Sequence, residues 1–393
     1  MERCVVVGAS MAGLRAAEAV RKAGFGGELV VIGDEPHLPY NRPPLSKEAL
    51  LGSHTAADLA FRMPRAAQEV IWRLGERAVG TDLEARSLTL ADGRTLEWSG
   101  LVVATGLTPR RLSLPGPAAG RHVIRTLDDV AALRRELIPG ARLVIVGAGF
   151  IGCEVAAAAR AAGLEVDVVA PERVPVERLL GERFGRALQR RHEARGVRFH
   201  LGTVPVEFLG TTRVTGVRLS DGTELAADVV LEAVGCVPNA EWLEGNGLDL
   251  ADGVRCDNLL RVEGRPDVVA CGDVARFPNP LFDDVPRRVE HWTMATDTAK
   301  RAGASLGRHL VGAEPDPAPF APMPSFWSDQ YELRLQSFGA VGLGTDDVRL
   351  LEGDLDADSA VGYHRAGRLV GVVLVGLPRR YQHYRALIAD GGR

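Results

Sequence analysis

The stretch that decides the fold class is Cys4-Val5-Val6-Val7-Gly8-Ala9-Ser10-Met11-Ala12-Gly13. An apolar strand runs directly into a glycine turn, and the following pattern predicts a helix from Leu14 to Ala23 that ends at Gly24. A second apolar strand, Leu29 to Ile32, ends at Gly33. This order predicts a β-α-β unit with two parallel strands.

The same order returns at residues 142–172, with a strand at 143–146, a turn from Gly147 to Gly152, a helix up to Gly163 and a strand at 166–169. In such turns the first glycine allows the sharp bend, the second admits a pyrophosphate and the third lets the helix pack on the strand. One turn alone is also compatible with an ordinary tight connection. Two of them predict two dinucleotide sites.

Composition excludes several other classes of protein. The 393 residues are 46% hydrophobic and 25% charged, with a net charge of -4, which is typical of a soluble globular protein and not of a general nucleic-acid binder. The 5 cysteines are scattered without metal-ligand or redox-dithiol spacing, so we expect no metal site. The sequence shows no signal peptide and no membrane-spanning run, and we expect a cytoplasmic protein.

The pattern changes after the second module. Residues 315–324 are rich in proline and predict a linker. Residues 361–375 predict two strands around a glycine turn, and a final helix is expected near Arg379. The predicted fold class is therefore α/β, with two Rossmann-like dinucleotide-binding domains and a small α+β C-terminal domain.

Several further motifs resemble the flavin-dependent ferredoxin reductases. They are the block Pro39-Tyr40-Asn41-Arg42-Pro43-Pro44-Leu45-Ser46-Lys47, the turn Ala104-Thr105-Gly106, the strand end Val268 to Asp273, Val289-Glu290-His291-Trp292 and Phe326-Trp327-Ser328-Asp329-Gln330. They occur in the family's order over essentially the whole chain. The chain is most similar to the reductases of putidaredoxin reductase and dioxygenase type.

The resemblance implies a glutathione-reductase-like arrangement. An FAD domain at 1–110 and 236–314 would be interrupted by an NAD(H) domain at 111–235 and followed by an interface domain at 315–393. It implies FAD and NADH as cofactors and a [2Fe-2S] ferredoxin as acceptor, which serves a haem-thiolate monooxygenase or a Rieske-type dioxygenase. We expect a monomer that binds neither nucleic acid nor membrane.

The resemblance also assigns residues to the two dinucleotides. Asp34 and Glu35 end the second strand, where carboxylates accept hydrogen bonds from ribose hydroxyls. The predicted FAD contacts are Gly8, Ser10, Ala12, Gly13, Asp34, Glu35, Arg42, Lys47, Val79, Ala104, Thr105, Gly106, Arg125, Gly272, Asp273, Val289 and Trp292. The predicted NAD contacts are Gly147, Gly149, Ile151, Gly152, Glu154, Arg173 and Gly235.

Three residues are predicted to act in electron transfer. The family places a lysine matching Lys47 beside the flavin and a glutamate matching Glu154 beside the nicotinamide, and we hypothesise that they form an ion pair there. Lys47 is one of only three lysines, and the prolines before it stiffen its loop. Alternatively, Ser46 caps a helix that Lys47 starts, and Glu154 is an acid in a first helical turn. Trp327 is expected to line the electron exit.

Two positions depart from the family pattern. Ser10 replaces the second glycine of the first turn, and its hydroxyl can still donate to a phosphate. After the strand that ends at Val169, neutral Ala170 stands where an acid would read the ribose, and Glu172 and Arg173 follow. An acid disfavours the 2′-phosphate of NADPH and an arginine favours it. Because Ala170 is neutral and Glu172 and Arg173 have opposite effects, these residues do not decide between the two donors. The family resemblance implies a preference for NADH, and we expect NADPH also to be accepted.

Other functions fit the same motifs. A rubredoxin reductase or an NADH oxidase would use another acceptor, although such oxidases often have a reactive cysteine near the flavin and residues 39–47 contain none. A nucleotide-sensing flavoprotein with little turnover would keep both dinucleotide sites. Paired arginines, at 110–111, 287–288 and 379–380, are candidates for contacting an acidic ferredoxin.

Overall fold

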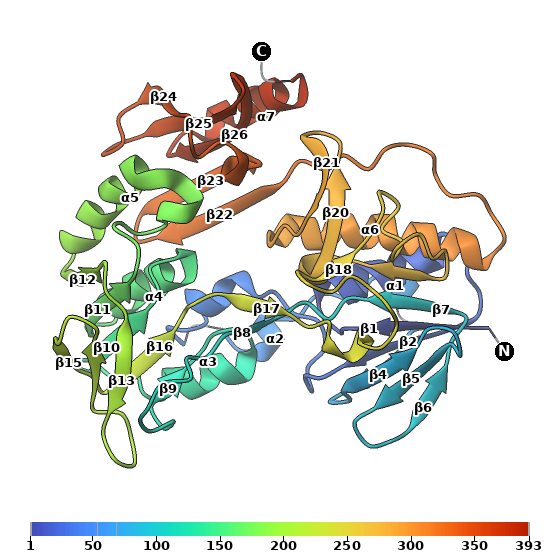
Figure 1. Cartoon of the computed structure of the whole chain (residues 1–393), viewed down its shortest axis with the longest axis horizontal. Coiled ribbons are helices and arrows are strands. Elements are labelled where there is room, and N and C mark those ends of the chain that lie inside the picture. The colour runs from blue at the N-terminus through green and yellow to red at the C-terminus, as the bar shows by residue number, and fades with distance from the viewer. Residues whose placement is uncertain (1, 53, 68, 392–393) are drawn as a thin grey trace. The chain divides into compact units, whose positions relative to one another are not determined.

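The computed structural model describes residues 2–52, 54–67 and 69–391, which form two compact units (Figure 1). The first unit contains residues 1–41, 59–108 and 237–325. The second contains residues 42–58, 109–236 and 326–393.

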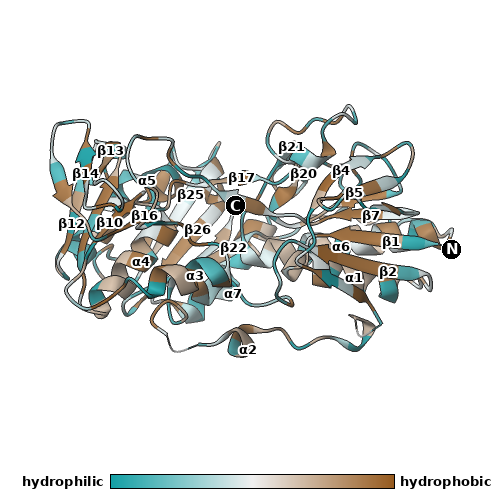
Figure 2. Ribbon diagram, turned by 90° about the horizontal axis from the view of Figure 1, so that it is seen from below, coloured by the Kyte–Doolittle hydropathy of each residue, from teal (hydrophilic) through white to brown (hydrophobic). Residues whose placement is uncertain are grey.

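The first unit is built on a five-stranded parallel sheet in the order β19-β7-β1-β2-β3. Its strands are β1 (Arg3–Val7), β2 (Glu28–Gly33), β3 (Ile71–Leu74), β7 (Gly100–Val103) and β19 (Val268–Ala270). Strands β1, β7 and β19 are almost wholly buried and consist mostly of valine, leucine and alanine, as parallel strands covered on both faces require. Figure 2 shows the hydrophobic character of β1 and β7. The sheet thus confirms the β-α-β unit predicted from residues 4–33.

Two helices of this unit, α1 (Met11–Lys22) and α6 (Trp292–Leu310), pack closely against each other. A Cβ added to Gly303 would lie 2.4 Å from the carbonyl oxygen of Ala16, and one added to Gly307 would lie 2.7 Å from the Cβ of Ala23. The two glycines therefore permit the close approach of the helix axes. Through this contact α6 supports the helix that follows the first glycine turn.

Shorter elements complete the first unit. A three-stranded antiparallel sheet contains β4 (Ala78–Asp82), β5 (Ser87–Leu90) and β6 (Thr95–Glu97). A second small sheet contains β18 (Val254–Arg255), β20 (Ala275–Asn279) and β21 (Asp283–Arg287). The 3₁₀ turns are η2 (Arg65–Ala67), η3 (Glu241–Leu243) and η4 (Gly272–Val274). The remaining strands at the points where the chain passes between units are β8 (Leu107–Pro109) and β17 (Cys236–Pro238).

The second unit repeats the architecture of the first. Its parallel sheet has the order β12-β11-β10-β16-β9, with β9 (Arg121–His122), β10 (Arg142–Val146), β11 (Glu165–Ala170), β12 (Val197–Leu201) and β16 (Val229–Glu232). Strand β9 has only two residues and ends at His122, four residues before Thr126, the N-cap of the next helix.

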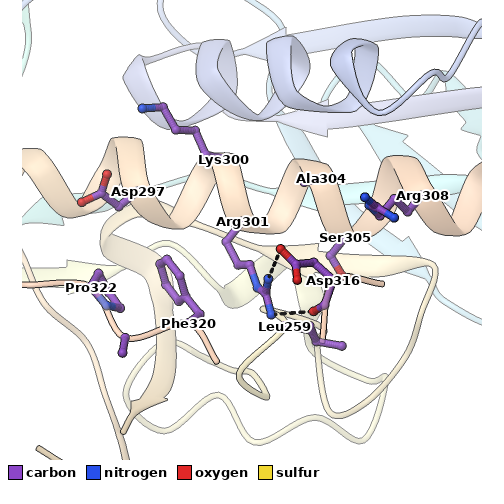
Figure 3. A pocket seen from close by; sticks show the side chains of 11 residues that line it. Leu259, Asp297, Lys300, Arg301, Ala304, Ser305, Arg308, Asp316, Phe320 and Pro322 are labelled. Atoms are coloured by element: carbon purple, nitrogen blue, oxygen red, sulfur yellow. Dashed lines mark hydrogen bonds and ion pairs between the residues drawn. The ribbon is translucent and has the colours of Figure 1, made fainter. Parts of the chain in front are cut away.

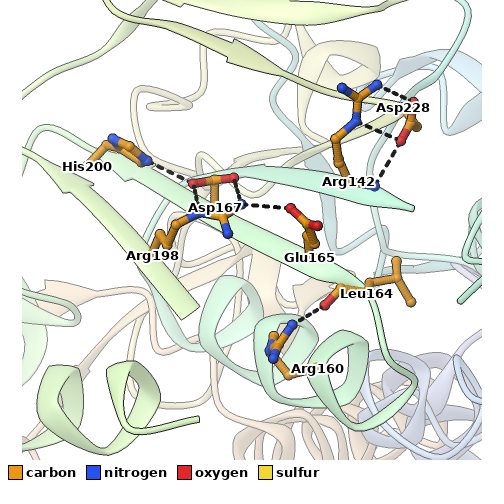
Figure 4. A network of polar contacts seen from close by, with 8 residues as sticks. All are labelled: Arg142, Arg160, Leu164, Glu165, Asp167, Arg198, His200 and Asp228. Carbon is orange, nitrogen blue, oxygen red and sulfur yellow. Dashed lines mark hydrogen bonds and ion pairs between the residues drawn. The ribbon is translucent and has the colours of Figure 1, made fainter. Parts of the chain in front are cut away.

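An ionic cluster ties the edge of this sheet together (Figure 4). Asp167 is 5% exposed and accepts hydrogen bonds from Arg198 at 2.7 Å and from His200 at 2.9 Å. Burial alone would raise the pKa of Asp167, but the Arg198 and His200 hydrogen bonds outweigh it and lower that pKa. The cluster thus holds β11 and β12 in register.

The helices of the second unit include α3 (Leu127–Arg134), α4 (Phe150–Ala161) and α5 (Glu177–Glu193), which is kinked at Gly181. Two short segments, η1 (Pro43–Ser46) and α2 (Ala56–Leu59), come from the block after β2. A three-stranded antiparallel sheet contains β13 (Pro205–Leu209), β14 (Gly216–Leu219) and β15 (Glu224–Ala226).

The C-terminal part of the second unit is a five-stranded sheet in the order β22-β23-β26-β25-β24, with β22 (Ser325–Gln330), β23 (Leu333–Gly339), β24 (Val348–Gly353), β25 (Ser359–Arg365) and β26 (Arg368–Val375). The turns η5 (Val341–Leu343) and η6 (Pro378–Arg380) and the helix α7 (Tyr381–Ala389) accompany it. The hairpin predicted at 361–375 is β25 and β26, and residues 313–324 contain no helix or strand. These predictions and the fold class are confirmed.

The described helices include none with both the length and the apolar composition needed to cross a membrane. Within the same residues, no cluster of His, Cys, Asp and Glu side chains is suited to hold a metal ion.

Candidate functional site

The first glycine turn lies at the carboxyl ends of β1, β7 and β19. Gly8 has a φ of +120°, and a Cβ there would lie 2.1 Å from the carbonyl oxygen of Ala104. Gly13 packs against the same turn, since its Cβ would lie 1.8 Å from the carbonyl oxygen of Gly8. Gly272 (φ +73°) follows β19, and its Cβ would lie 2.9 Å from that of Ala12. The structure therefore brings together predicted residues from three distant segments.

The turn after β7 is fixed by reciprocal hydrogen bonds. Thr105 Oγ1 donates to the carbonyl of Asn239 at 2.6 Å, and Asn239 Nδ2 donates to the carbonyl of Thr105 at 3.0 Å. The backbone N–H of Asn239 also donates to the carbonyl of Gly106. Asn239 was not among the predicted site residues, and its position after a Val-Pro pair is its only signal in the sequence.

Both glycine turns open helices whose first N–H groups are available. Helix α1 starts after Ser10 and α4 starts after Gly149, and neither has a side-chain cap or an acidic residue in its first turn. A Cβ added at Gly149 would meet no atom within 4 Å, so the loop is open there. An uncapped helix N-terminus beside an open glycine loop fits a pyrophosphate. Both sites thus fit a dinucleotide.

The second turn repeats the packing of the first. A Cβ at Gly147 would lie 2.2 Å from the carbonyl oxygen of Ala233, and one at Gly152 would lie 2.0 Å from that of Gly147. Ile151 is 43% exposed at the start of α4. Gly235 has a φ of +89° and an open Cβ position, and its carbonyl accepts from the Arg110 amide.

The central feature of the second unit is an ion pair between Lys47 and Glu154. Lys47 Nζ lies 2.8 Å from Glu154 Oε2, and only 13% and 4% of the two side chains are exposed. Lys47 Nζ also donates to the carbonyl of Pro43 at 3.2 Å. Ser46 Oγ donates to Glu154 Oε2 at 2.5 Å, and Ser328 Oγ donates to Glu154 Oε1 at 2.7 Å. The predicted ion pair is therefore present. Two serines also donate to Glu154, and the sequence did not indicate these two hydrogen bonds.

Two local expectations about this cluster are wrong. Ser46 does not cap a helix that starts at Lys47, because it is the last residue of η1 and its hydroxyl is used by Glu154. Glu154 is not in the first turn of α4, which starts at Phe150 and has no acid in that turn.

Other predicted residues are placed as follows. Arg42 Nη1 donates to the carbonyl of Arg125 at 2.5 Å, and Thr126 and Asp129 form a capping box at the start of α3. Trp327 is half-buried in β22, where alternation directs it to the face opposite Ser328.

The remaining predicted FAD contacts lie in the first unit. The Trp292 ring stacks on Phe61 with centroids 6.2 Å apart. Glu35 Oε2 accepts from the Tyr40 hydroxyl, whereas Asp34 is exposed. The carbonyl of Asp273 accepts from Arg288, the neighbour of half-buried Val289. Val79 lies in β4 and is 48% exposed.

Ala170, where an acid would read the ribose, is the last residue of β11. Ala170 is 1% exposed. Arg173 Nη2 lies 2.6 Å from Glu177 Oε1 and 3.3 Å from Glu182 Oε2, and Glu172 pairs with Arg178. The charge of Arg173 is therefore already shared with two carboxylates.

A pocket of about 540 Å³ lies beside α6 in the first unit (Figure 3). Arg301 reaches across it and donates to the carbonyls of Asp316 and Ala318. Lys300 extends from α6 in a different direction from Arg301. These arginine contacts fasten the segment before β22 to α6, and they involve none of the predicted site residues.

Two glycine turns that each begin an uncapped helix, together with a buried lysine–glutamate pair, are the features of an oxidoreductase that uses two dinucleotides. The model of the family "Pyridine nucleotide-disulphide oxidoreductase" matches residues 2–299, and that of "Reductase C-terminal" matches residues 325–393. The chain belongs to this oxidoreductase family and, within it, to the FAD-dependent ferredoxin reductases. Its cofactors are FAD and NAD(P)H.

The chain is similar to the ferredoxin–NAD(+) reductase component of an anthranilate 1,2-dioxygenase system from Burkholderia cepacia, with 37% identity covering 98% of this chain and 94% of the relative. A ferredoxin reductase for the CYP199A2 system from Rhodopseudomonas palustris matches with a TM-score of 0.91 and 35% identity, covering 100% and 96% of the two chains. The reductase in a covalent putidaredoxin reductase–putidaredoxin complex also has a TM-score of 0.91, with 32% identity covering 99% and 93%.

Proposed function

We propose that this chain passes a hydride from NADH to FAD and then single electrons to a [2Fe-2S] ferredoxin of a monooxygenase or dioxygenase system. The observation that carries the proposal is the buried ion pair of Lys47 and Glu154 in the unit that contains the second glycine turn. The names of the relatives support ferredoxin as the acceptor, since they belong to a dioxygenase system, a CYP system and a complex with putidaredoxin.

FAD, when bound, accepts two electrons from the donor and passes them on one at a time. The chain's own residues hold and orient the two dinucleotides. The first N–H groups of α1 and α4 would bind the two pyrophosphates. Lys47 would place a fixed positive charge beside the reacting rings, and Glu154 would orient the nicotinamide and hold the Lys47 ammonium in place.

Trp327 is proposed as a wall of the electron exit, because its ring lies on the face of β22 opposite the Glu154 cluster. We also propose the three-domain division at 1–110 with 236–314, 111–235 and 315–393, and a cytoplasmic location. The α/β modules at residues 3–33 and 142–170 support the first two domains, and the sheet from β22 to β26 supports the third.

NADH is proposed as the preferred donor. A 2′-phosphate would have to compete with Glu177 and Glu182 for Arg173, and the neutral Ala170 does not exclude it. We therefore expect kcat/KM to be higher for NADH than for NADPH, with NADPH still accepted as a donor.

The test uses the purified FAD-loaded protein. Rapid bleaching of its flavin absorbance by NADH, followed by reoxidation with a [2Fe-2S] ferredoxin and cytochrome c as reporter, supports the proposal. Parallel reactions with rubredoxin and with oxygen alone reveal a different acceptor. If NADH reduced the flavin only slowly, and the reduced flavin persisted in the presence of every acceptor, the result would favour a nucleotide sensor and contradict the proposal.

Candidate ferredoxins should be taken from the same genome and tested one by one. Docking through the exposed arginine pairs at 110–111 and 379–380 predicts that ferredoxin reduction weakens as salt rises. The pair at 287–288 is less suited to docking, because Arg288 is only 12% exposed and pairs with Asp252 and Glu290. The step from NADH to the flavin serves as the internal control, because it needs no ferredoxin.

A further inference from the structure

A buried chain of hydrogen bonds starts at His192 in α5 and ends on the Glu154 carboxylate in α4. His192 Nε2 lies 2.8 Å from Gln330 Oε1, Gln330 Nε2 donates to Ser328 Oγ at 3.0 Å, and Ser328 Oγ donates to Glu154 Oε1 at 2.7 Å. The exposed fractions of these four residues lie between 0% and 4%. These hydrogen bonds therefore connect α5, β22 and α4 through buried side chains.

The direction of every proton in this chain is fixed by its neighbours. Ser328 Oγ gives its one hydrogen to the carboxylate, so toward Gln330 it can only accept, and Gln330 Nε2 is the donor. This orients the Gln330 carbonyl oxygen toward His192, so Nε2 of His192 is the protonated nitrogen. Burial lowers the pKa of His192, which agrees with a neutral ring. All three donors therefore point toward Glu154.

The two carboxylate oxygens of Glu154 have different numbers of donors. Oε2 receives both Lys47 and Ser46, whereas Ser328 is the one donor to Oε1 among the described residues. A buried carboxylate oxygen without a donor is costly, and a carboxylate held on one side only can rotate. The position of Glu154 thus depends on Ser328.

We propose that Ser328, oriented by Gln330 and His192, is a positioning residue for Glu154 in hydride transfer. This inference rests on the proposed role of Glu154. Alignment of the reacting atoms is sensitive to small displacements, so a loosened Glu154 should slow the transfer more than it weakens NADH binding. In the described part of the chain, Lys47 pairs with this carboxylate and His192 ends the chain of hydrogen bonds that leads to it. The Cys153 thiol lies on the same helix, and burial, with a smaller effect of Glu154, raises its pKa.

The decisive variants are Ser328→Ala and Ser328→Thr, with Ser337→Ala as the matched control. Ser337 is also fully buried in the C-terminal sheet, and its Oγ has no hydrogen-bond partner in the part of the chain that the structure describes. Stopped-flow reduction over a range of NADH concentrations separates the limiting hydride-transfer rate from the Kd. Calorimetry of NAD⁺ binding to the oxidised holoprotein at several pH values adds a readout that needs no turnover.

We expect Ser328→Ala to lower the limiting rate about tenfold, which equals about 1.4 kcal/mol, with the Kd within about twofold of wild type. The acid limb of the rate profile and of NAD⁺ affinity should move to higher pH, because the carboxylate loses a donor. Glu154→Gln should lack this limb. Ser328→Thr should restore the wild-type values, and Ser337→Ala should keep them.

The proposal is overturned if Ser328→Ala keeps the wild-type rate, if its rate falls without a shift of the acid limb, or if Ser337→Ala falls equally. Should Ser328→Ala fail to fold, His192→Leu and His192→Gln decide, since glutamine keeps an N–H at the same distance from the backbone. His192→Leu should slow hydride transfer about threefold, and His192→Gln should keep the wild-type rate. Equal transfer rates in these two variants would contradict the proposal. A wild-type protein that NADH does not reduce would instead refute the proposed function itself.

Discussion

Lys47 Nζ lies 2.8 Å from Glu154 Oε2 although 107 residues separate the two in the sequence (154 − 47). Both side chains are mostly buried, and the prolines of η1 hold the backbone that leads to Lys47. A charge fixed in this way needs no reorganisation during the reaction.

Changing either member of the pair should therefore slow flavin reduction. We expect Lys47→Ala and Glu154→Gln to lower the hydride-transfer rate at least about tenfold, because each removes a fixed charge at the proposed site. Removing one partner of a buried pair also costs about 3–5 kcal/mol, so unfolding should be measured alongside stopped-flow kinetics. Lys22→Ala is a control, since Lys22 pairs with Glu18 on the surface. Wild-type hydride-transfer rates in both Lys47→Ala and Glu154→Gln would contradict the proposed role of the ion pair.

The carboxylates around Arg173 should limit the use of NADPH. Replacing both Glu177 and Glu182 with glutamine releases the guanidinium for a 2′-phosphate. We expect kcat/KM for NADPH to rise about three- to tenfold, because ion pairs between exposed side chains are weak, while that for NADH stays nearly constant. Adding Arg173→Ala should cancel the gain. If the wild type already preferred NADPH more than about tenfold, the assignment would be reversed.

Gly8 should be essential for FAD binding. Its φ of +120° is strained for alanine, and the added Cβ would lie 2.1 Å from the carbonyl oxygen of Ala104. Gly24→Ala is the matched control, because Gly24 has a φ of +100° but open space around it. We expect Gly8→Ala to purify with little FAD and a lowered Tm, and Gly24→Ala to keep its FAD with a smaller change in Tm. The flavin-to-protein absorbance ratio and thermal unfolding measure both effects.

Thiol reagents should react slowly with most cysteines of the native protein. Burial raises the pKa of the Cys4, Cys153 and Cys271 thiols to about 12 and also raises that of Cys256, whereas Cys236 is only half-buried. Titration with Ellman's reagent should therefore modify Cys236 alone, and the other four thiols should appear after denaturation. Cys236→Ser should abolish the native reaction. Rapid native modification of two or more thiols would contradict this burial pattern.

The protein should lose stability as the pH falls from about 6.5 toward 4. Burial lowers the pKa of His291 to about 4, whereas an unfolded histidine titrates near ~6.5. In this window the unfolded chain binds more protons than the folded one, so acid favours unfolding. Urea unfolding at pH 7.5, 6.0 and 5.0 should show a shallower loss for His291→Gln than for wild type. Parallel pH profiles would remove His291 from this effect.

The parts that could be predicted from sequence are local. The glycine turns, the strands around them, the capping box at Thr126 and the final hairpin all follow from neighbouring residues. The Lys47–Glu154 pair was foreseen only through the family resemblance. Ser46 was misjudged because its hydroxyl finds a partner 108 residues away rather than in its own helix turn. His192 and Gln330 were missed for the same reason, since 138 residues separate them.

The close contact of α1 with α6 has a consequence for biosynthesis. The first β-α-β module leaves the ribosome early, but its sheet has no β19 until residue 270 is made and α1 has no α6 until residue 310. The second parallel sheet, from β9 to β16, is complete by residue 232. The second parallel sheet can therefore form during synthesis while the first parallel sheet waits for its last strand and for the helix that packs on α1.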